Sequence, residues 1–433
     1  MIKLYLIRIL IFLKLKKISK NLLKFLRVFI KVILFIPNIL LLFVLRNNFQ
    51  KDKKKIFGLR LSRKYFGHLA IESAMASAYQ EVNKDSKIIT SFKPGKGIDN
   101  KYLNSIHSLT FNLTNDFLLI LLNFFYYSSF GFFQRLLKKY YEPFIDKNNP
   151  EREVKYVDYL ESSNDFPWRK VGRNLILYKK NNLRNIIIAM RTSYFHDGKI
   201  EVASQPWKDA SIRDIYKIIK ATNLLNNEEK VIFYTNKNIW GEIKKMKINL
   251  DKIYFVDQNK IDVLDLINKD SLVINNGNGL GAGIYALGIR TLYLHHTAWH
   301  FWHTAHSNSL AYPCIFKNSK YNYKDLKRII ELAFLSKSLP CDFEKNFYSK
   351  GVIHNKISDL EVFSIQNSII ESFKIKSLEE RSKSTCLGVD FYYSNSKEKY
   401  FWELFIKNQP NYLRECRKLI TLNIASEFLN SYI

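Results

Sequence analysis

The sequence contains few cysteines and few of the short motifs that identify common enzyme classes. Its four cysteines, Cys314, Cys341, Cys386 and Cys416, lie far apart with no C-x-x-C spacing. They exclude a disulfide framework and a zinc ribbon and indicate a reducing compartment. The absence of G-x-x-x-x-G-K-[ST] excludes a P-loop ATPase. Because H-E-x-x-H and a D-x-D after a strand are also absent, we expect no catalytic metal.

Acidic residues are almost absent from the N-terminal segment, residues 1–55, where fourteen Lys or Arg stand against one acid, Asp52. This segment holds +13 of the formal net charge of +29. Its longest uncharged run, residues 32–45, has 14 residues and contains Pro37, whereas a membrane-spanning helix needs about 20 apolar residues. We expect the segment to lie on an anionic membrane surface with its apolar side chains at the acyl boundary. A single tilted transmembrane anchor is the alternative.

The basic excess does not indicate a nucleic-acid partner. Lys, Asn and Ile are abundant throughout the chain, so part of the charge reflects composition. In the N-terminal segment the basic residues alternate with aliphatic residues rather than with the aromatic residues on which bases stack. We therefore expect no nucleic acid as a partner. No small-residue cleavage site follows the segment, so a removable signal peptide is not expected.

The chain contains two series of alternating strand and helix patterns. The first has a strand at residues 56–62, a helix at 63–82 and a strand at 86–92. The second comprises strand 185–190, helix 211–225, strand 230–235, a helix, strand 252–256, helix 261–267, strand 271–275, a helix and strand 291–294. Strands that alternate with helices predict right-handed crossovers and a parallel sheet. The fold prediction is an α/β protein of two lobes, of which the second is doubly wound.

Three other regions complete the predicted organisation. The apolar residues 117–133 are too short to span a membrane and predict either a core helix or a membrane-facing hairpin. Residues 145–184 are polar and are predicted to link the lobes, and from about residue 325 the pattern is mostly helical. The predicted regions are a membrane-associated segment (1–55), a first α/β lobe (56–180), a second α/β lobe (181–340) and a helical C-terminal region (341–433).

A glycine-rich stretch, SLVINNGNGLGAGIYALGIRTLYL (271–294), places four glycines within seven residues after a predicted strand. Ligands of open parallel sheets bind beyond the carboxyl ends of the strands. Glycines let the backbone approach a ligand, and the first N–H groups of a helix are unpaired donors with partial positive charge. Such a loop suits a phosphate or diphosphate, and we assign its contacts to Asn276, Gly277, Asn278, Gly279 and Gly281. Alternatively, the glycines merely permit tight packing of strand and helix.

A dinucleotide cofactor is not expected at this loop. The glycines follow G-x-G-x-G-x-G rather than G-x-G-x-x-G, and the stretch comes after a late strand of its series rather than the first. No acidic residue follows about 20 residues on, where one would bind a ribose. We expect no cofactor.

Three further residues are candidates for chemistry. His68 follows a predicted strand and glycine turn, where it could accept a proton from an attacking hydroxyl or merely hydrogen-bond the turn. Glu72, one helical turn later, could orient His68 or cap the helix. Arg191 ends the first strand of the second series, where it could hold a diphosphate with two hydrogen bonds or form a surface salt bridge. Asp209 and Ser211 resemble a helix N-cap.

Five of the nine histidines lie between residues 295 and 306. We assign His295 and His296 to nucleotide or phosphate contacts from the loop after the strand 291–294. Two alternatives remain open for this region. On a helix one face would present a possible zinc site, or the histidines would pack with neighbouring aromatic residues. The residues concerned are His296, His300, His303 and His306 for zinc, and Trp299, Phe301 and Trp302 for packing.

Four stretches together resemble the GT-B glycosyltransferases, and within them a bacterial family found with surface polysaccharide genes. They are FGHLAIE (66–72), IIIAMRTSYFHD (186–197), WKDAS (207–211) and the glycine-rich stretch (271–295). The resemblance covers about residues 56–320 and implies two Rossmann-like lobes of GT-B type. It implies an acceptor on the first lobe and a nucleotide sugar on the second.

The resemblance implies a glycosyltransferase that moves a sugar from a nucleotide sugar to a lipid-linked or polysaccharide acceptor. The expected location is the cytoplasmic face of the bacterial inner membrane. The sequence departs from the family at two positions. The helix after the glycine loop lacks the acidic residue that often binds the donor ribose, and Thr192 and Ser193 follow Arg191 where the family tends to have an acid. The alternatives are a non-catalytic membrane-associated binding protein and a GT-B-like nucleotide-sugar epimerase.

Overall fold

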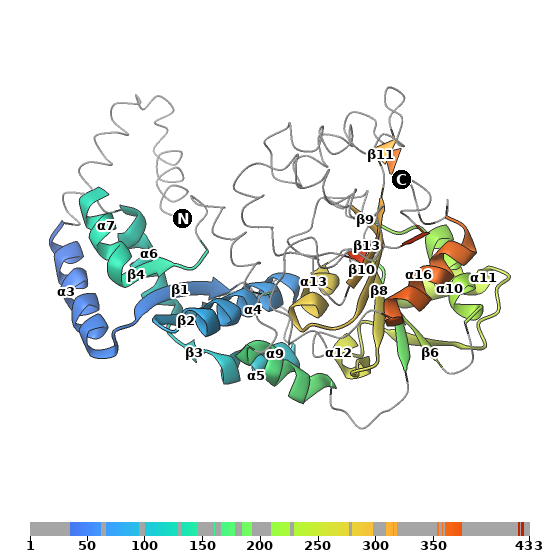
Figure 1. Cartoon of the computed structure of the whole chain (residues 1–433), viewed down its shortest axis with the longest axis horizontal. Helices are drawn as coiled ribbons and strands as arrows, with labels where there is room; N and C mark the ends of the chain where they lie inside the picture. Colours follow the sequence, from blue (N-terminus) through green and yellow to red (C-terminus); the bar gives the residue numbers. More distant parts are fainter. Residues whose placement is uncertain are drawn as a thin grey trace. The chain divides into compact units, whose positions relative to one another are not determined.

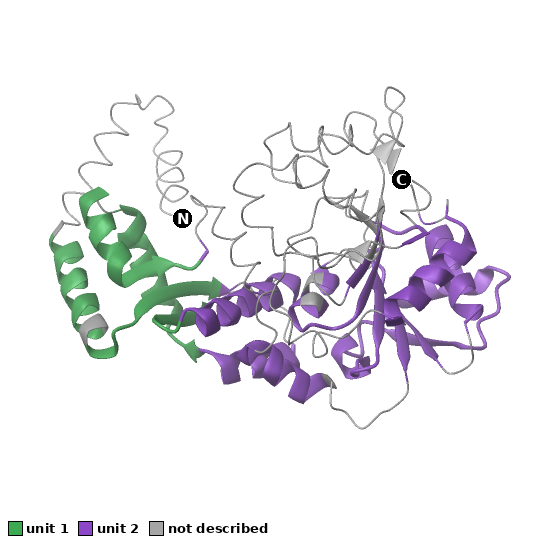
Figure 2. Ribbon diagram, in the orientation of Figure 1, with its two compact units in different colours: residues 1–60, 84–91, 112–144 green, residues 61–83, 92–111, 145–433 purple. Residues whose placement is uncertain are grey.

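The chain divides into two compact units, which are described separately (Figure 2). Unit 1 contains residues 1–60, 84–91 and 112–144, and unit 2 contains residues 61–83, 92–111 and 145–433. The lobe boundaries predicted from the sequence stay a prediction. The structure, a computed structural model, describes residues 35–61, 66–94, 100–128, 131–145, 160, 166–177, 184–192, 209–225, 229–276, 279–297, 309–314, 316–317, 353–354, 357, 360–374, 423–424 and 426–427.

Unit 1 is built on a four-stranded sheet (Figure 1). The strands lie in the order β3-β2-β1-β4, and the β1–β4 and β2–β3 pairs are parallel. The predicted strands at residues 56–62 and 86–92 are confirmed as β1 and β2. Strands β3 and β4 are too short to leave a pattern in the sequence. The bounds are Lys55–Leu61 (β1), Ser86–Phe92 (β2), Asn112–Leu113 (β3) and Tyr141–Pro143 (β4).

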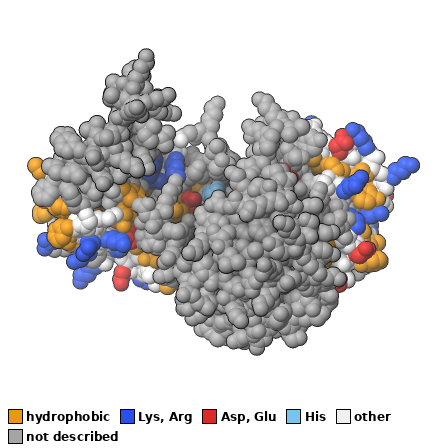
Figure 3. Space-filling model, turned by 90° about the horizontal axis from the view of Figure 1, so that it is seen from above, with side chains coloured by type: hydrophobic (Ala, Val, Ile, Leu, Met, Phe, Trp, Pro, Cys, Tyr) orange, Lys and Arg blue, Asp and Glu red, His pale blue; other side chains and the backbone are white. Residues whose placement is uncertain are grey.

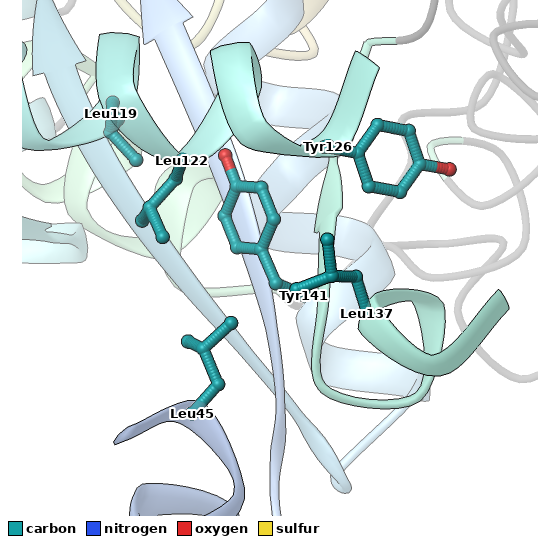
Figure 4. Close-up of a cluster of buried hydrophobic side chains, with 6 residues drawn as sticks. All are labelled: Leu45, Leu119, Leu122, Tyr126, Leu137 and Tyr141. Atoms are coloured by element: carbon teal, nitrogen blue, oxygen red, sulfur yellow. The ribbon is translucent and has the colours of Figure 1, made fainter. Parts of the chain in front are cut away.

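Three helices of unit 1 are α3 (Phe35–Asp52), α6 (Asp116–Ser128) and α7 (Gly131–Tyr140). One buried hydrophobic cluster joins them to β4 (Figure 4), and it consists of Leu45, Leu119, Leu122, Tyr126, Leu137 and Tyr141. The apolar residues 117–133 thus lie mostly in two short helices. One face of α6 is buried in the cluster, whereas Phe117 on α6 and Phe132 on α7 are exposed. The stretch is therefore not a fully buried core helix.

Polar contacts connect the elements of unit 1. Arg60 of β1 donates from Nε and Nη2 to the two carboxylate oxygens of Asp116 on α6, each at 2.7 Å. The Ser91 hydroxyl of β2 donates to the same carboxylate at 2.7 Å. Bidentate pairs of this kind are strong and directional, so they hold α6 in register on the sheet. In the hydrophobic cluster the Tyr141 hydroxyl donates to Asn123 Oδ1 at 2.7 Å, and burial raises the pKa of Tyr141.

Unit 2 contains a seven-stranded sheet in the order β13-β10-β9-β8-β5-β6-β7, and its neighbouring strands pair in parallel. Counted from β5 as the first strand, the sheet from β7 to β10 follows the order 3-2-1-4-5-6 of the doubly wound nucleotide-binding fold. The prediction of an α/β fold with a parallel sheet is confirmed. The bounds are Asn185–Ile188 (β5), Lys230–Thr235 (β6), Ile253–Asp257 (β7), Leu272–Asn275 (β8), Thr291–Thr297 (β9), Ser309–Cys314 (β10) and Asn423–Ile424 (β13).

The helices of unit 2 that were predicted from the sequence are confirmed with small changes at their ends, whereas α5 (Lys101–Thr110) and α9 (Pro167–Gly172) were not predicted. Helix α10 is held at its start by a capping box, because the Ser211 side chain accepts from the Asp214 N–H while the Asp214 carboxylate accepts from the Ser211 N–H. The predicted N-cap role is therefore confirmed for Ser211. The bounds are Phe66–Val82 (α4), Lys101–Thr110 (α5), Pro167–Gly172 (α9), Ile212–Asn223 (α10), Lys237–Lys245 (α11), Val263–Leu266 (α12), Gly279–Ala286 (α13) and Val362–Lys374 (α16).

Most of the predicted helical C-terminal region lies outside the described residues. Helix α16 (Val362–Lys374) confirms the predicted helical pattern for the residues that it contains. A two-stranded antiparallel ladder joins β11 (Phe316–Lys317) to β12 (Ile353–His354).

The predicted polar linker at residues 145–184 is wrong for residues 166–177. This part forms α9 and a π-helical turn at Arg173–Leu177. The side chain of Trp168 is fully buried, and its backbone N–H donates to the Ser77 hydroxyl of α4 at 3.1 Å. Average polarity conceals the short apolar run around Trp168, which docks α9 on α4 because aromatic burial is strongly favourable.

Polar contacts also connect α5 to α12. Asn100, the N-cap of α5, donates to the carboxylate of Asp262, which is the N-cap of α12. Tyr102 donates to Asp265, and Lys101 Nζ lies 3.2 Å from Asp265 Oδ1. Burial raises the pKa of Asp262, and burial followed by the hydrogen bond to Asp265 raises the pKa of Tyr102 to about 12.

Among the described residues, none of the helices combines the length and the apolar character needed to cross a bilayer. Residues 1–34 of the predicted membrane-associated segment lie outside the described residues.

Candidate functional site

The candidate site lies where the strand order of unit 2 reverses. From β5 the chain proceeds to β6 and β7 on one side, and then returns to β8 on the other side of β5. Such a switch point leaves a crevice at the carboxyl ends of the two central strands, where ligands of this fold bind. Arg191 follows β5 and the glycine loop follows β8. The topology therefore brings together two predicted parts of the site that are about 85 residues apart in sequence.

Asn276 joins the ends of these two strands. Its side-chain oxygen accepts from the backbone N–H of Arg191 at 2.8 Å, and its side-chain amide donates to the Arg191 carbonyl at 2.9 Å. Asn276 is buried, so this reciprocal pair satisfies an amide that would be costly to leave unpaired. The structure thus shows Asn276 positioning the backbone of Arg191, which is a different task from the direct phosphate contact predicted for it.

The guanidinium of Arg191 is held by Asp209. Arg191 Nε lies 2.7 Å from Asp209 Oδ1, and the two side chains are 21% and 8% exposed. The Ala210 N–H donates to the Arg191 carbonyl at 2.8 Å, so the segment that leads into α10 is fastened to the end of β5. Asp209 therefore has a role that its N-cap prediction missed. The contact is an ion pair, and the guanidinium of Arg191 carries five N–H donors in a planar fork.

Helix α4 begins against the start of α13 (Figure 1). A Cβ atom on Gly67 would lie 2.3 Å from the carbonyl oxygen of Gly279, so the two backbones are in direct contact. A Cβ atom on Gly283 would lie 2.0 Å from Phe66 Cε1, because the Phe66 ring packs on α13. Helix α4 also buries the small residues Ala70, Ser73, Ala74 and Ser77. The FGHLAIE stretch is thus brought onto the glycine loop within unit 2.

His68 and Glu72 lie at this contact, because His68 is next to Gly67. His68 Nδ1 lies 3.6 Å from Glu72 Oε1, and the side chains are 58% and 18% exposed. The predicted orientation of His68 by Glu72 is consistent with this spacing. A carboxylate beside Nδ1 favours the tautomer that carries its proton there, which leaves Nε2 as the proton acceptor.

Two helix N-termini meet at the same place. The N-terminus of a helix carries a partial positive charge. Neither α4 nor α13 has an acidic residue in its first turn to offset that charge. Helix N-termini favour anionic ligands, and Gly279 is exposed at the start of α13.

The glycines of the loop have different tasks. Gly281 is buried, and a Cβ atom there would lie 2.6 Å from Asn275 Oδ1. Together with Gly283 it permits tight packing, which was the alternative explanation of the motif. At Gly279 a Cβ atom would meet only the Gly67 nitrogen, at 3.9 Å. Packing does not require glycine at position 279, whereas close approach of a ligand would. Gly277 and Asn278 lie outside the described residues.

His295 and His296 belong to β9, which extends to Thr297 rather than ending at Leu294. The prediction that they lie in a loop after the strand is therefore wrong. His296 pairs with Pro313 of β10 in the backbone ladder, so a helical zinc face that includes His296 is excluded. His300, His303 and His306 lie outside the described residues. In the described part of the chain, no group of three His, Cys, Asp or Glu residues could hold a metal ion.

The Gly67–Gly279 contact predicts a difference between two glycine substitutions. Gly67→Ala should lower the free energy of unfolding by about 1–3 kcal/mol or more, because its Cβ meets backbone that cannot move aside cheaply. Gly279→Ala should change it by no more than about 0.5 kcal/mol, because the space is open. Chemical denaturation of the two variants measures both. Equal stability of the two variants would contradict the contact of α4 with α13.

No family model and no curated protein matches this sequence. Among solved structures, the chain is similar to a glycosyl transferase family 9 protein from Veillonella parvula DSM 2008, with 10% identity, a TM-score of 0.34 and coverage of 74% of this chain and 98% of that one. It is similar to the E. coli ADP-heptose LPS heptosyltransferase II, with 12% identity, a TM-score of 0.31 and coverage of 55% and 84%. A UDP-GlcNAc 2-epimerase from Methanocaldococcus jannaschii shares 11% identity, with a TM-score of 0.23 and coverage of 55% and 84%. Because these scores are low, the function has to be argued from the residues of the site.

Proposed function

We propose that the chain is a glycosyltransferase of GT-B type that uses a nucleotide-sugar donor. The observation that carries the proposal is the convergence at one switch point of Arg191, the glycine loop and the first turn of α4 with His68. A cationic fork, two helix N-termini and a proton acceptor are the groups that glycosyl transfer from a diphosphate needs. The proposal involves no metal and no cofactor.

In this proposal the diphosphate of the donor binds to Arg191 and to the backbone at Gly279. Departure of the nucleoside diphosphate builds negative charge on its terminal phosphate. A guanidinium and preorganised N–H groups stabilise that charge without reorganisation. Asp209 and Asn276 hold Arg191 in place from its side chain and from its backbone, so the fork is preorganised for the bidentate contact.

His68 then serves as the general base. Its exposed imidazole removes the proton from the acceptor hydroxyl as that oxygen attacks the anomeric carbon. The neighbouring Glu72 carboxylate stabilises the imidazolium that forms. The proton thus moves from the hydroxyl to His68, while the bond from the anomeric carbon to the phosphate oxygen breaks.

The proposed acceptor is a lipid-linked or polysaccharide chain, and the proposed location is the cytoplasmic face of the bacterial inner membrane. The support is the basic and aliphatic N-terminal segment, which carries fourteen Lys or Arg and one acid. Such a segment is attracted to anionic lipid and would hold the enzyme beside a lipid-linked substrate.

Nucleoside diphosphates and nucleotide sugars are expected to raise the melting temperature. At a ligand concentration of about 100 times Kd, binding to the native state stabilises it by about 2.7 kcal/mol. The matching nucleoside monophosphates, which lack the second phosphate, are the control and should stabilise less. Differential scanning fluorimetry with a panel of donors measures the melting temperature. If no nucleotide raises it, the proposal is wrong.

Product analysis separates the alternatives. A transferase consumes a nucleotide sugar in proportion to added acceptor and forms a glycosidic bond. An epimerase converts the donor sugar without any acceptor. A non-catalytic membrane-associated binding protein leaves both substrates unchanged.

A further inference from the structure

Helix α3 is apolar on two opposite faces. Its inner face packs in the hydrophobic cluster of unit 1 through Leu45 (Figure 4). Leu41 and Leu42, which are partly buried, pack against the same cluster. The side chains on the other face, which we call the outer stripe, are all exposed: Ile36, Ile39, Leu40, Phe43 and Val44. Their spacing of i, i+3, i+4, i+7 and i+8 places them on one side of a helix. A helix that is apolar all round is normally covered on every side.

Basic residues adjoin the outer stripe. Arg46 and Lys51 follow it on α3 and are exposed. Helix α7, which packs beside α3 through Leu137, has no acidic residue and exposes Arg135, Lys138 and Lys139. Figure 3 shows hydrophobic side chains next to Lys and Arg side chains on the surface around α3. An apolar stripe bordered by cations is complementary to a layer of anionic headgroups over hydrocarbon.

The chain that leads into α3 has the same character. Residues 1–34 contain nine Lys or Arg and no acidic residue, interleaved with aliphatic residues. Continuity of this pattern into the outer stripe favours one surface that both could contact. A protein partner would need to match an apolar stripe and a long cationic sequence, whereas an anionic bilayer matches both.

We infer that the outer stripe of α3 is the membrane-docking surface of the protein and lies in the interface of an anionic bilayer. This deepens the membrane attachment in the proposed function and assigns it to named side chains. Phe43 lies near the middle of the docking surface. Arg46 and Lys51 contact the headgroups, while the inner face stays packed on unit 1. Helix α3 thus serves both as a structural helix and as an interfacial anchor.

The test is co-sedimentation of the full chain with vesicles of phosphatidylcholine, with and without phosphatidylglycerol. The wild type should bind the anionic vesicles and bind less well at high salt, because salt screens the cationic contribution. Leu40→Glu with Phe43→Glu should lower partition by about tenfold or more, because apolar contact with the acyl boundary is lost. Phe363→Glu is the matched control, since Phe363 of α16 is 67% exposed and Phe43 is 63% exposed.

Support requires that the Leu40/Phe43 variant loses vesicle binding with its melting temperature unchanged, and that Phe363→Glu binds as the wild type does. Three results would overturn the inference. Unchanged vesicle binding would show that the outer stripe does not contact lipid. A large loss of melting temperature would show that the chain itself covers it. A dimeric wild type that becomes monomeric in the variant would show that a second copy covers it. Nucleotide binding should persist in this variant, so failure here is distinct from failure of the proposed catalytic site.

Discussion

Replacing His68 by alanine should lower kcat by about 100-fold or more, the usual contribution of general base catalysis. The affinity for the nucleoside diphosphate should change little, because the imidazole acts on the acceptor hydroxyl rather than on the phosphates. The His68 side chain is 58% exposed, so its truncation should leave the packing of α4 largely intact. Steady-state kinetics and isothermal titration calorimetry measure the two effects.

Glu72→Gln is the matched variant, because it keeps the size of the side chain and removes its charge. Loss of the charge should lower kcat less than loss of His68 does, because the imidazole remains and only the carboxylate at 3.6 Å that stabilises the imidazolium is lost. A histidine that merely hydrogen-bonds its turn would give melting-temperature losses in place of these kinetic ones. Weaker nucleotide binding by His68→Ala, with kcat preserved, would assign the phosphates to α4 and overturn the role of the base.

Strands β1, β2 and β5 to β9 follow directly from the sequence, whereas β3, β4, β10 and β13 were not predicted. Runs such as Lys230–Thr235 and Leu272–Asn275 are short, apolar and bounded by polar or turn residues, which is the pattern of buried parallel strands. Alternation with helical segments then predicts the parallel sheet. The strand order comes only from tertiary structure, because the pattern of β8 does not say on which side of β5 it will pair.

The sequence did not predict the contacts of the site that join elements distant along the chain. Gly67 and Gly279 each look like ordinary glycines before a helix, and only the packing of α4 on α13 makes them neighbours. The position of Asp209 just before Ser211 predicts a helix cap, but the Asp209 carboxylate forms an ion pair with Arg191. Asn276 was assigned to a ligand by its place in the loop. The hydrogen bonds of its side-chain amide go to the backbone of Arg191.

The extent of β9 illustrates a different difficulty. His295 and His296 are weak strand formers, so the pattern appears to end at Leu294. Pairing with β10 nevertheless continues to Thr297, across a register shift between Tyr312 and Pro313. The nucleotide contacts predicted for these two histidines stay a prediction, with both residues placed in β9.

Replacing Arg191 by alanine should weaken nucleoside diphosphate binding by about 1.5–3 kcal/mol, the contribution of hydrogen bonds to a charged group. This corresponds to a rise in Kd of about 10-fold to 150-fold, and turnover should also fall because the leaving group loses its stabilisation. Binding of the nucleoside monophosphate, which lacks the terminal phosphate, should change less. Titration calorimetry with both ligands measures the difference.

Two further variants separate charge from geometry. Arg191→Lys keeps the charge but loses the planar fork, so it should restore only part of the affinity. Asp209→Asn keeps the size of its side chain and removes the carboxylate that holds Nε at 2.7 Å, so the guanidinium should lose its fixed direction. We expect Asp209→Asn to lower kcat by a larger factor than it raises the Kd of the nucleoside diphosphate. A mobile Arg191 guanidinium still attracts the phosphates, but it is no longer preorganised to stabilise the transition state. If Arg191→Ala binds diphosphate as tightly as the wild type, the diphosphate does not lie at the end of β5 and the switch point is not the donor site.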